Sequence, residues 1–389
     1  MKFLSQLKQN DLKGKVCLVR IDLNIKDTEL NENNLRVQAV LPTIKFLLKN
    51  GAKVVLFSHR GRPGKVKSKM ENVKWNQEFT LKPFAKIFEK LLGQPVEFAN
   101  FGATVKDSDI ILAENLRFLK GEEENSEKLG KQLAMLGDIY INDAFAVSHR
   151  ANASVAAITK FIPSYAGLLL EKEINNLGKV RGTTRNGRGL TRKENGKHPF
   201  VVILGGEKIS DKIGLINNFI NKADYFLLGG GIAINFFMAQ GLPIGDSICD
   251  PNADLRGIKR GLARNKNIIL PIDVAIDKRR ILDIGPGAVK EFSAIIKKAK
   301  TIIWNGPMGL IEDKKFRKGS DGIVREILNS KAFTVVGGGE TAGLFNGKLK
   351  MEKGKKNIFI STGGGAMLEY LSGKKLPGLE ALKHKNTRT

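Results

Sequence analysis

Three runs of three consecutive glycines lie in the second half of the chain, each after a short apolar stretch. The runs are residues 229–231, 337–339 and 363–365. Glycine has no Cβ, so its backbone N–H groups can approach an anion closely, and a helix beginning there adds its positive end. Several such loops favour a phosphate or nucleotide site over simple turns. Gly205 and Gly206 repeat the pattern, and Lys208 and Lys212 follow with positive charge.

The first half of the chain carries charged and polar side chains, not glycines, after its predicted strands. These are Arg20, Asp22, Asn24, His59, Arg62, Asn115, Arg117, His149 and Arg150. Arg36 opens the first long predicted helix. A guanidinium group can direct two N–H donors at one anion. A single arginine is usually part of a surface ion pair, but the recurrence of arginine at strand ends favours a site for a small phosphate- or carboxylate-bearing substrate.

Other common site patterns are missing or weak in this sequence. Neither a P-loop motif nor the catalytic-loop motif of protein kinases occurs. Residues 337–342 match the dinucleotide fingerprint G-x-G-x-x-A, but no acidic residue ends a clear next strand about 20 residues later. With 4 histidines and 2 cysteines, a His/Cys metal cage is not expected. Cys17 and Cys249 are interpreted as buried thiols in a reducing compartment, not as a disulfide.

Short apolar segments alternate with helix-like segments along the chain, which predicts an α/β protein with parallel sheets. The predicted strands are residues 16–21, 54–57, 110–112, 139–142, 201–204, 225–228, 268–270, 301–304, 334–336 and 358–360. The predicted helices are residues 35–49, 79–92 and 126–136, with a rigid connector at 166–180. Parallel strands bind ligands beyond their carboxyl ends, which is where the polar residues occur.

The length of 389 residues predicts two domains, and 42% hydrophobic residues suffice for two cores. No apolar run reaches the roughly 18 residues of a membrane span, and the N-terminus does not resemble a signal peptide. We therefore expect a cytoplasmic protein without membrane contact. The net charge of +26 and a basic loop at residues 181–198 leave open a nucleic-acid-binding α/β protein as an alternative. Aromatic residues are few in the basic stretches, so no specific nucleic-acid partner is expected.

Eight short motifs, in the same order along nearly the whole chain, resemble the phosphoglycerate kinase family. They are residues 19–24, 58–63, 114–118, 142–145, 204–208, 304–307, 337–341 and 361–366. The resemblance implies two Rossmann-like domains, each a parallel sheet flanked by helices, joined by a hinge helix. Residues 1–165 would bind phosphoglycerate and residues 166–369 the nucleotide. The tail, about 370–389, would return to the first domain.

The resemblance also implies a reaction and a set of residues. The family transfers the acyl phosphate of 1,3-bisphosphoglycerate reversibly to ADP, giving 3-phosphoglycerate and ATP, with Mg²⁺ and as a monomer. The residues implied for phosphoglycerate are Asp22, Asn24, Arg36, His59, Arg62, Arg117 and Arg150. Those implied for the nucleotide are Lys208, Lys212, Gly229, Gly230, Asn305, Glu312, Gly338, Gly339, Glu340 and Thr341. Arg36, Lys208 and Lys212 would be catalytic.

One departure from the family pattern concerns the metal. Glu340 stands where the family usually has Asp, beside the expected Mg²⁺. Two other classes remain as alternatives at this point: the nucleic-acid-binding protein and a dehydrogenase using residues 337–342. Base-reading side chains on one exposed helix would favour the first, and an acidic residue ending the next strand would favour the second.

Overall fold

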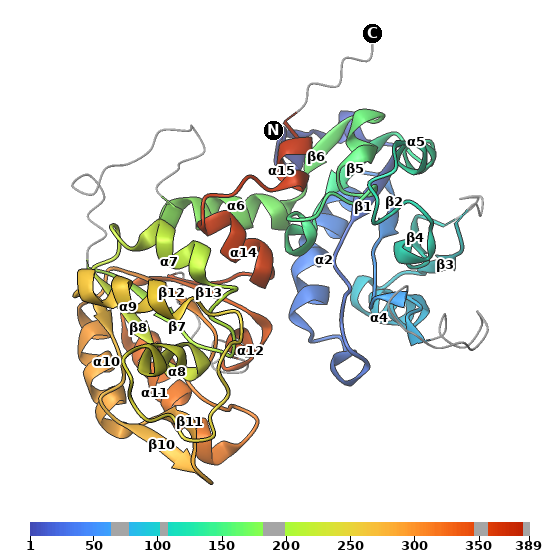
Figure 1. The fold of residues 1–389 in the computed structure, drawn as a ribbon. Helices are drawn as coiled ribbons and strands as arrows, with labels where there is room; N and C mark the ends of the chain where they lie inside the picture. The colour runs from blue at the N-terminus through green and yellow to red at the C-terminus, as the bar shows by residue number, and fades with distance from the viewer. Residues whose placement is uncertain (64–77, 102–107, 182–198, 346–356, 384–389) are drawn as a thin grey trace. The chain divides into compact units, whose positions relative to one another are not determined.

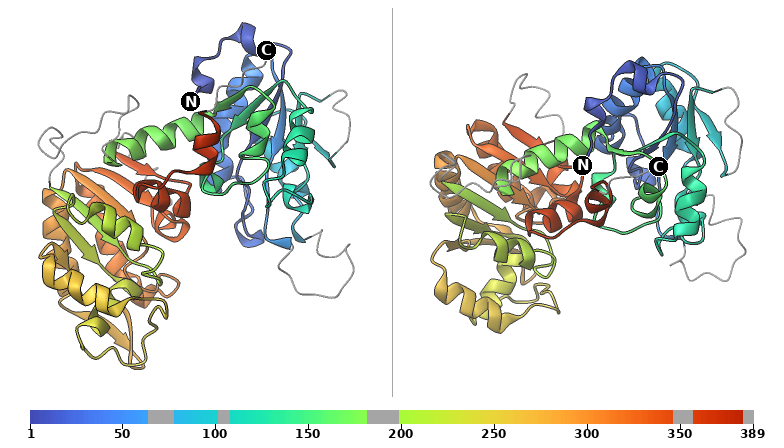
Figure 2. Two further views of the ribbon diagram at one scale, coloured as in Figure 1. Left: turned by 45° about the horizontal axis from the view of Figure 1, so that its top comes forward. Right: turned by 90° about the horizontal axis from the view of Figure 1, so that it is seen from above.

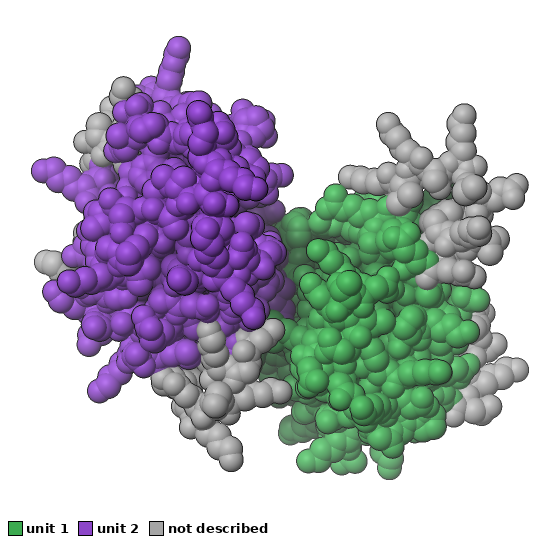
Figure 3. Space-filling model, turned by 90° about the horizontal axis from the view of Figure 1, so that it is seen from below, with its two compact units in different colours: residues 1–174, 375–389 green, residues 175–374 purple. Residues whose placement is uncertain are grey.

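The computed structural model describes residues 1–63, 78–101, 108–181, 199–345 and 357–383. They divide into two compact units, coloured in Figure 3. Unit 1 is Met1–Ile174 with Lys375–Thr389, and unit 2 is Asn175–Lys374. The division falls inside α6 (Leu168–Arg181), the predicted connector helix, whereas the sequence suggested a boundary after residue 165. Except for Arg181, the predicted basic loop lies outside the described residues.

Unit 1 contains a six-stranded parallel sheet in the order β3-β4-β2-β1-β5-β6. The strands are β1 (Val16–Arg20), β2 (Lys53–Phe57), β3 (Glu97–Ala99), β4 (Ile110–Ala113), β5 (Ile139–Asn142) and β6 (Ser164–Ala166). The central strands β1, β2, β4 and β5 are almost wholly buried, as their continuous apolar runs predict. Side chains just after these strands therefore share one edge of the sheet.

The longer helices lying wholly within unit 1 are α2 (Leu35–Lys49), α4 (Lys82–Leu92) and α5 (Glu127–Ala134). Helix α2 begins where the Asn34 side chain accepts a hydrogen bond from the Arg36 N–H, a typical N-cap. The same helix buries Val37, Ile44 and Leu47 against the sheet. Each such aliphatic side chain stabilises the fold by about 1.5–3 kcal/mol. The N-cap and this packing together fix where Arg36 leaves the helix.

Unit 2 repeats the architecture with a parallel sheet in the order β14-β13-β12-β7-β8-β9 (Figure 1). The strands are β7 (Phe200–Leu204), β8 (Tyr225–Leu228), β9 (Ile268–Ile269), β12 (Thr301–Asn305), β13 (Phe333–Gly337) and β14 (Ile358–Ile360). A separate antiparallel hairpin joins β10 (Val274–Asp277) to β11 (Arg280–Ile284). The core is centred on Trp304, which is fully buried and meets Phe345 edge-on.

Helices lie on both faces of the unit 2 sheet (Figures 1 and 2). They are α7 (Ile213–Phe219), α8 (Gly230–Ala239), α9 (Leu255–Arg264), α10 (Pro286–Lys298), α11 (Lys318–Asn329), α12 (Gly339–Gly343) and α14 (Gly364–Leu371). Successive strands are added outward from β7 in both directions, and right-handed crossovers in opposite directions place helices on opposite faces. Helices α8, α12 and α14 begin at the three glycine runs, directly after β8, β13 and β14.

The predicted fold class is confirmed, and every predicted strand is present within two residues at each end. The sequence analysis missed the edge strands β3 and β6 and the β10–β11 hairpin. The tail forms α15 (Pro377–Ala381), where the Gly378 N–H donates to Ser148 O in unit 1. Cys17 is buried and Cys249 half-buried, and both are free thiols. Among the described residues, no helix combines the length and apolarity that a membrane crossing requires.

Candidate active site

The carboxyl edge of the unit 1 sheet gathers arginine and histidine side chains from five separate segments. We call this set the basic cluster: Arg20, Arg36, His59, Arg62, Arg117 and Arg150. Arg20 ends β1, Arg36 lies in the first turn of α2, and the other members follow β2, β4 and β5. Their mutual electrostatic effects show that they are neighbours, because the charges of four of these arginines lower the pKa of His59. The predicted phosphoglycerate residues of unit 1 thus lie together.

Arg36 is held in place by two residues from the loop after β1. Its Nη1 lies 2.8 Å from Asp22 Oδ2 and donates to Asn24 O at 2.9 Å. Asp22 is largely buried, whereas the Arg36 side chain remains 34% exposed. The ion pair therefore fixes one side of the guanidinium and leaves the rest accessible to an anion. A donor oriented before the ligand arrives loses less entropy on binding.

His59 is a buried, neutral hydrogen-bond donor in the centre of the basic cluster. Arg20 Nη2 lies 3.1 Å from His59 Nδ1. A guanidinium can only donate, so Nδ1 accepts and the ring proton is on Nε2. Burial lowers the pKa of His59 well below 6.5, and neighbouring charges lower it further, in the order Arg20, Arg117, Arg150 and Arg36. Nε2–H is thus available as a donor without adding a charge.

The remaining arginines of the cluster surround the loop after β2. Arg117 Nη1 donates to Gly61 O, and the Gly61 N–H donates to Asn24 Oδ1 at 2.9 Å. Burial lowers the pKa of Arg117, which Glu123, 3.5 Å from Nε, opposes. Arg150 donates through Nε to His149 Nε2 at 3.3 Å. The exposed Arg62 is close enough for its charge to lower the pKa of Arg117.

Two arginines at these strand ends serve the fold, although their positions resemble those of the others. Arg60 is 4% exposed, donates through Nε to Ile25 O at 3.0 Å and pairs with Asp27. Arg20 is 1% exposed and is committed to His59, Ser154 and its neighbouring backbone. The sequence suggests that Arg20 is one of the anion-binding arginines, but each of its three side-chain nitrogens already donates inside unit 1.

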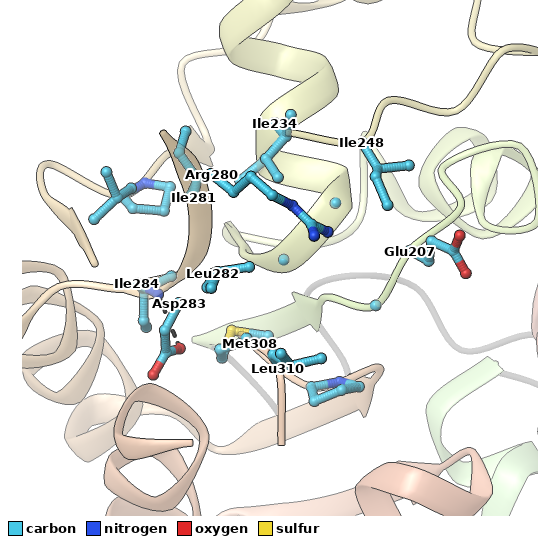
Figure 4. Close-up of a pocket in the computed structure, with 18 of the residues that line it drawn as sticks. Glu207, Ile234, Ile248, Arg280, Ile281, Leu282, Asp283, Ile284, Met308 and Leu310 are labelled. Carbon is cyan, nitrogen blue, oxygen red and sulfur yellow. Dashed lines mark hydrogen bonds between the residues drawn. The ribbon is translucent and has the colours of Figure 1, made fainter. Parts of the chain in front are cut away.

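Unit 2 contains a pocket beyond the carboxyl ends of β7, β8 and β12 (Figure 4). One side is backbone, from Gly206, Gly230, Gly231 and Pro307. The other is apolar and comes from α8, the loop after α8, β11 and the loop after β12, with Ile234, Ile248, Ile281, Leu282, Met308 and Leu310. Four carboxylates, Glu207, Asp283, Glu312 and Glu340, also line it. A pocket with an apolar wall and a few polar groups suits a flat base with an attached ribose.

The glycines of this pocket do not all act through free N–H groups, which corrects the expectation from sequence. The N–H groups of Gly205, Gly206, Gly229 and Gly230 donate to Asn305 O, Pro307 O, Leu204 O and Met308 O respectively, at 2.8 to 3.0 Å. Gly230 has φ +56°, and a Cβ there would lie 2.9 Å from Gly206 N. These glycines let two loops touch, which gives the pocket a flat backbone wall. Gly229 itself does not line the pocket.

The loop at the start of α12 differs from that wall. Gly338 has φ +91°, which permits the turn from β13 into the helix. Gly339 is the first helical residue and is exposed, and a Cβ added to it would meet nothing within 4 Å. The first N–H groups of a helix have no partner inside the helix. Internal packing therefore does not require glycine at 339, whereas close approach of an anion would.

The other predicted nucleotide residues lie around this loop. The Thr341 hydroxyl accepts from Gly306 N–H at 2.9 Å, and the Asn305 Nδ2 would lie 3.3 Å from a Cβ on Gly338. Lys212 is 7% exposed, and its Nζ would lie 3.7 Å from a Cβ on Gly206. Burial lowers the pKa of Lys212, while Asp211 and Glu340 oppose the shift. Lys208 is exposed on the loop after β7.

Sequence reasoning missed the contribution of the hairpin to the pocket. Arg280, Ile281 and Leu282 all enter it from β11 (Figure 4). The hairpin turn contains Lys278 and Arg279, both with positive φ, instead of the Asn-Gly or Asp-Gly pairs typical of such turns. No sequence signal for a two-residue turn was therefore present, and the pocket residues of the hairpin could not be placed.

Comparison with known proteins shows the family of the whole chain. The family model described as phosphoglycerate kinase matches residues 7–374. A phosphoglycerate kinase from Dictyoglomus turgidum is 40% identical, with 99% of each chain covered. The solved structure of phosphoglycerate kinase from Pyrococcus horikoshii has a TM-score of 0.80 at 29% identity and 98% coverage of both chains. That from Coxiella burnetii has a TM-score of 0.77 at 33% identity, covering 97% of this chain and 98% of the other.

Proposed function

The chain belongs to the phosphoglycerate kinase family, and we propose how its two sites divide the reaction between them. The enzyme is a phosphotransferase with a carboxyl group as acceptor, acting in glycolysis and gluconeogenesis. It interconverts 1,3-bisphosphoglycerate plus ADP with 3-phosphoglycerate plus ATP. Of the three classes considered from the sequence, this assignment selects the kinase. The family match over residues 7–374 carries it.

The basic cluster of unit 1, apart from Arg20, binds phosphoglycerate in our proposal. Arginines match the charge and the planar geometry of phosphate and carboxylate groups. Support comes from Arg36, whose guanidinium is fixed on one side by Asp22 and Asn24 and open on the other. His59 Nε2–H, Arg62, Arg117 and Arg150 supply further donors around the same point. The neutral His59 adds a donor without raising the repulsion among the arginines.

The pocket of unit 2 binds the nucleotide. Its apolar wall suits the base, next to the flat backbone surface of Gly206, Gly230 and Gly231. Glu312, which lines the pocket, accepts from the ribose hydroxyls. The phosphates then extend to Lys208, Lys212, Asn305 and the loop from Gly338 to Thr341. The open space around Gly339 supports this direction.

The chemistry requires no general base, because the attacking oxygen of ADP or of the carboxylate is already ionised at neutral pH. The transition state instead needs positive charge and N–H donors around a planar phosphoryl group. We assign this role to Arg36, Lys208 and Lys212. Each preorganised donor of this kind contributes about 2–4 kcal/mol in other enzymes.

A nucleotide-bound Mg²⁺ fits the donors available in unit 2. Mg²⁺ is usually held by one or two carboxylates, with substrate phosphates and water completing its shell. Glu340 lines the pocket and is near enough to Lys212 to raise its pKa. Among the described residues, no three His, Cys, Asp or Glu side chains are grouped so as to hold a metal alone. When bound, Mg²⁺ neutralises phosphate charge, and we propose Glu340 as its protein ligand.

A coupled assay tests the activity directly. Purified protein should form ATP from ADP and 1,3-bisphosphoglycerate, and the rate should depend on a divalent cation. Robust ADP binding without turnover under any metal would contradict the proposal. We also propose that the enzyme acts as a cytoplasmic monomer, which light scattering and fractionation would check.

A further inference from the structure

A buried chain of hydrogen bonds leads away from His59 into the interior of unit 1. Arg20 links His59 to Ser154, since Arg20 Nη2 lies 3.1 Å from His59 Nδ1 and Nε donates to Ser154 Oγ at 3.0 Å. Ser154 links Arg20 to Glu122, since Oγ donates to Glu122 Oε1 at 2.6 Å and the backbone N–H donates to Oε2 at 2.9 Å. None of the four side chains is more than 2% exposed.

The direction of every bond in this chain is determined by its members. A guanidinium only donates, so Ser154 Oγ and His59 Nδ1 accept from Arg20. The single hydroxyl proton of Ser154 is then free to go to Glu122, which accepts twice. The Glu122 carboxyl group, which accepts both bonds from Ser154, thereby fixes the hydroxyl, the guanidinium and the imidazole tautomer at the other end. A chain of polarised, charge-assisted bonds is stiffer than isolated neutral bonds.

Glu122 is also the carboxylate that the hydrogen-bond chain joins, through Ser154, to the buried charge of Arg20. Burial raises the pKa of Glu122, while Arg20, the bonds from Ser154 and Arg117 lower it. Arg20 is surrounded by other positive groups of the basic cluster, which repel it. Without a nearby anion, its buried charge would be strongly destabilising. Glu122 lies in the segment between η4 (Leu116–Phe118) and α5. It belongs to none of the motifs recognised in the sequence.

We propose that Glu122 is a positioning residue for the phosphoglycerate site. It acts through Ser154 and Arg20, holding His59 in the Nε2–H tautomer and keeping Arg20 turned inward, away from the substrate. This inference rests on the proposed phosphoglycerate role of His59. It predicts that the affinity for 3-phosphoglycerate falls when the hydrogen-bond chain is interrupted at a residue that touches neither the substrate nor His59.

Two variants interrupt the hydrogen-bond chain, and one matched variant leaves it intact. Glu122→Gln keeps the shape of the side chain but replaces one of its two acceptor oxygens with an N–H₂ donor. One of the two hydrogen bonds from Ser154 is then lost. Ser154→Ala removes the hydroxyl between Arg20 and Glu122 and serves if Glu122→Gln does not fold. The control is Tyr140→Phe, because the buried Tyr140 hydroxyl donates to Ser154 O at 2.6 Å but lies outside the chain to His59.

Calorimetric titration with 3-phosphoglycerate and ring ¹⁵N spectra of His59 provide the two readouts. With only 4 histidines in the protein, His59→Gln assigns the resonance. Glu122→Gln and Ser154→Ala should weaken 3-phosphoglycerate binding about tenfold, as for one charged hydrogen bond, and convert the ring signal to a tautomer mixture. ADP affinity should be unchanged. Tyr140→Phe should lower the unfolding temperature while leaving both readouts as in the wild type.

The proposal is wrong if the two cutting variants behave like Tyr140→Phe, with lower stability but unchanged affinity and tautomer. A different failure would point elsewhere. If the wild type does not bind 3-phosphoglycerate, yet the variants still lose the fixed tautomer, the chain positions His59 and the assignment of the substrate site is at fault.

Discussion

The two units share one architecture, and the anion sites that we propose on them are built by different means. In unit 1 the carboxyl edge of the sheet presents side chains, and those side chains are held by others, as Asp22 holds Arg36 and Arg20 holds His59. In unit 2 the same edge presents mainly backbone, with glycines that let loops touch or leave space open. The proposed anion site of unit 1 therefore depends on the identity and charge of its side chains. The proposed anion site of unit 2 depends on the absence of a Cβ at its glycines.

The largest effect is expected at the residues that we propose to stabilise charge on the moving phosphoryl group. Arg36→Ala in unit 1 and Lys208→Ala in unit 2 should each lower kcat by about 10²-fold or more, with smaller changes in KM. Lys297→Ala, on the exposed end of α10, is the control for loss of a positive charge. Steady-state kinetics decide the matter, and changes confined to KM would show that these residues only tether substrate.

Within unit 1, two arginines separated by one residue should respond oppositely. Arg62→Ala should raise KM for 3-phosphoglycerate about 10- to 100-fold at unchanged unfolding temperature, because an exposed charged donor is lost. Arg60→Ala should cost about 1–3 kcal/mol of stability, because buried carbonyl groups lose their donor. Thermal unfolding and kinetics on both variants test this. Equal loss of stability in the two would remove the distinction.

Within unit 2, two glycines of α12 provide the matched pair. A Cβ on Gly339 or on Gly343 would meet nothing within 4 Å, so neither substitution by alanine should disturb the fold. Gly339→Ala should nevertheless weaken ADP binding about tenfold, because the methyl group occupies the space of the phosphates. Gly343→Ala, at the far end of the helix, should leave it unchanged. If both variants bind ADP normally, the phosphates do not lie at the start of α12.

The smallest expected effect concerns the one side chain assigned to the metal. Glu340→Gln should weaken nucleotide binding about threefold to fivefold in the presence of Mg²⁺, as expected for an exposed charge. In the presence of EDTA the variant and the wild type should bind alike. Titrations in both buffers test the assignment, which fails if the ratio of affinities does not depend on the metal. A changed preference between Mg²⁺ and Mn²⁺ would further support it.

The regular elements were largely predictable because their signals are local. Helix α2 was predicted with its exact bounds, since apolar residues recur at helical spacing and an N-cap precedes them. The edge strands β3 and β6 have three residues each, too few for a pattern. The β10–β11 hairpin was missed because Lys278 and Arg279 occupy a turn that usually contains glycine.

The candidate site was predictable in its residue types and not in their burial. Arg60 and Arg62 look alike in sequence, yet one is buried in the fold and the other is exposed. The glycine runs predicted loops correctly, but only contacts distant in sequence show which N–H groups are already bonded. Glu122 lies in no sequence motif, because the role that we propose for it depends on its hydrogen bond with Ser154, 32 residues away.

Crossed calorimetric titration tests the division between the units most directly. Wild type, Arg62→Ala, Gly339→Ala and the double variant are each titrated with 3-phosphoglycerate and, separately, with Mg–ADP. We expect Arg62→Ala to weaken only 3-phosphoglycerate binding, Gly339→Ala to weaken only ADP binding, and the double variant to show the two losses independently. If either single variant weakens both ligands to the same degree, the two sites are not the separate side-chain and backbone sites described.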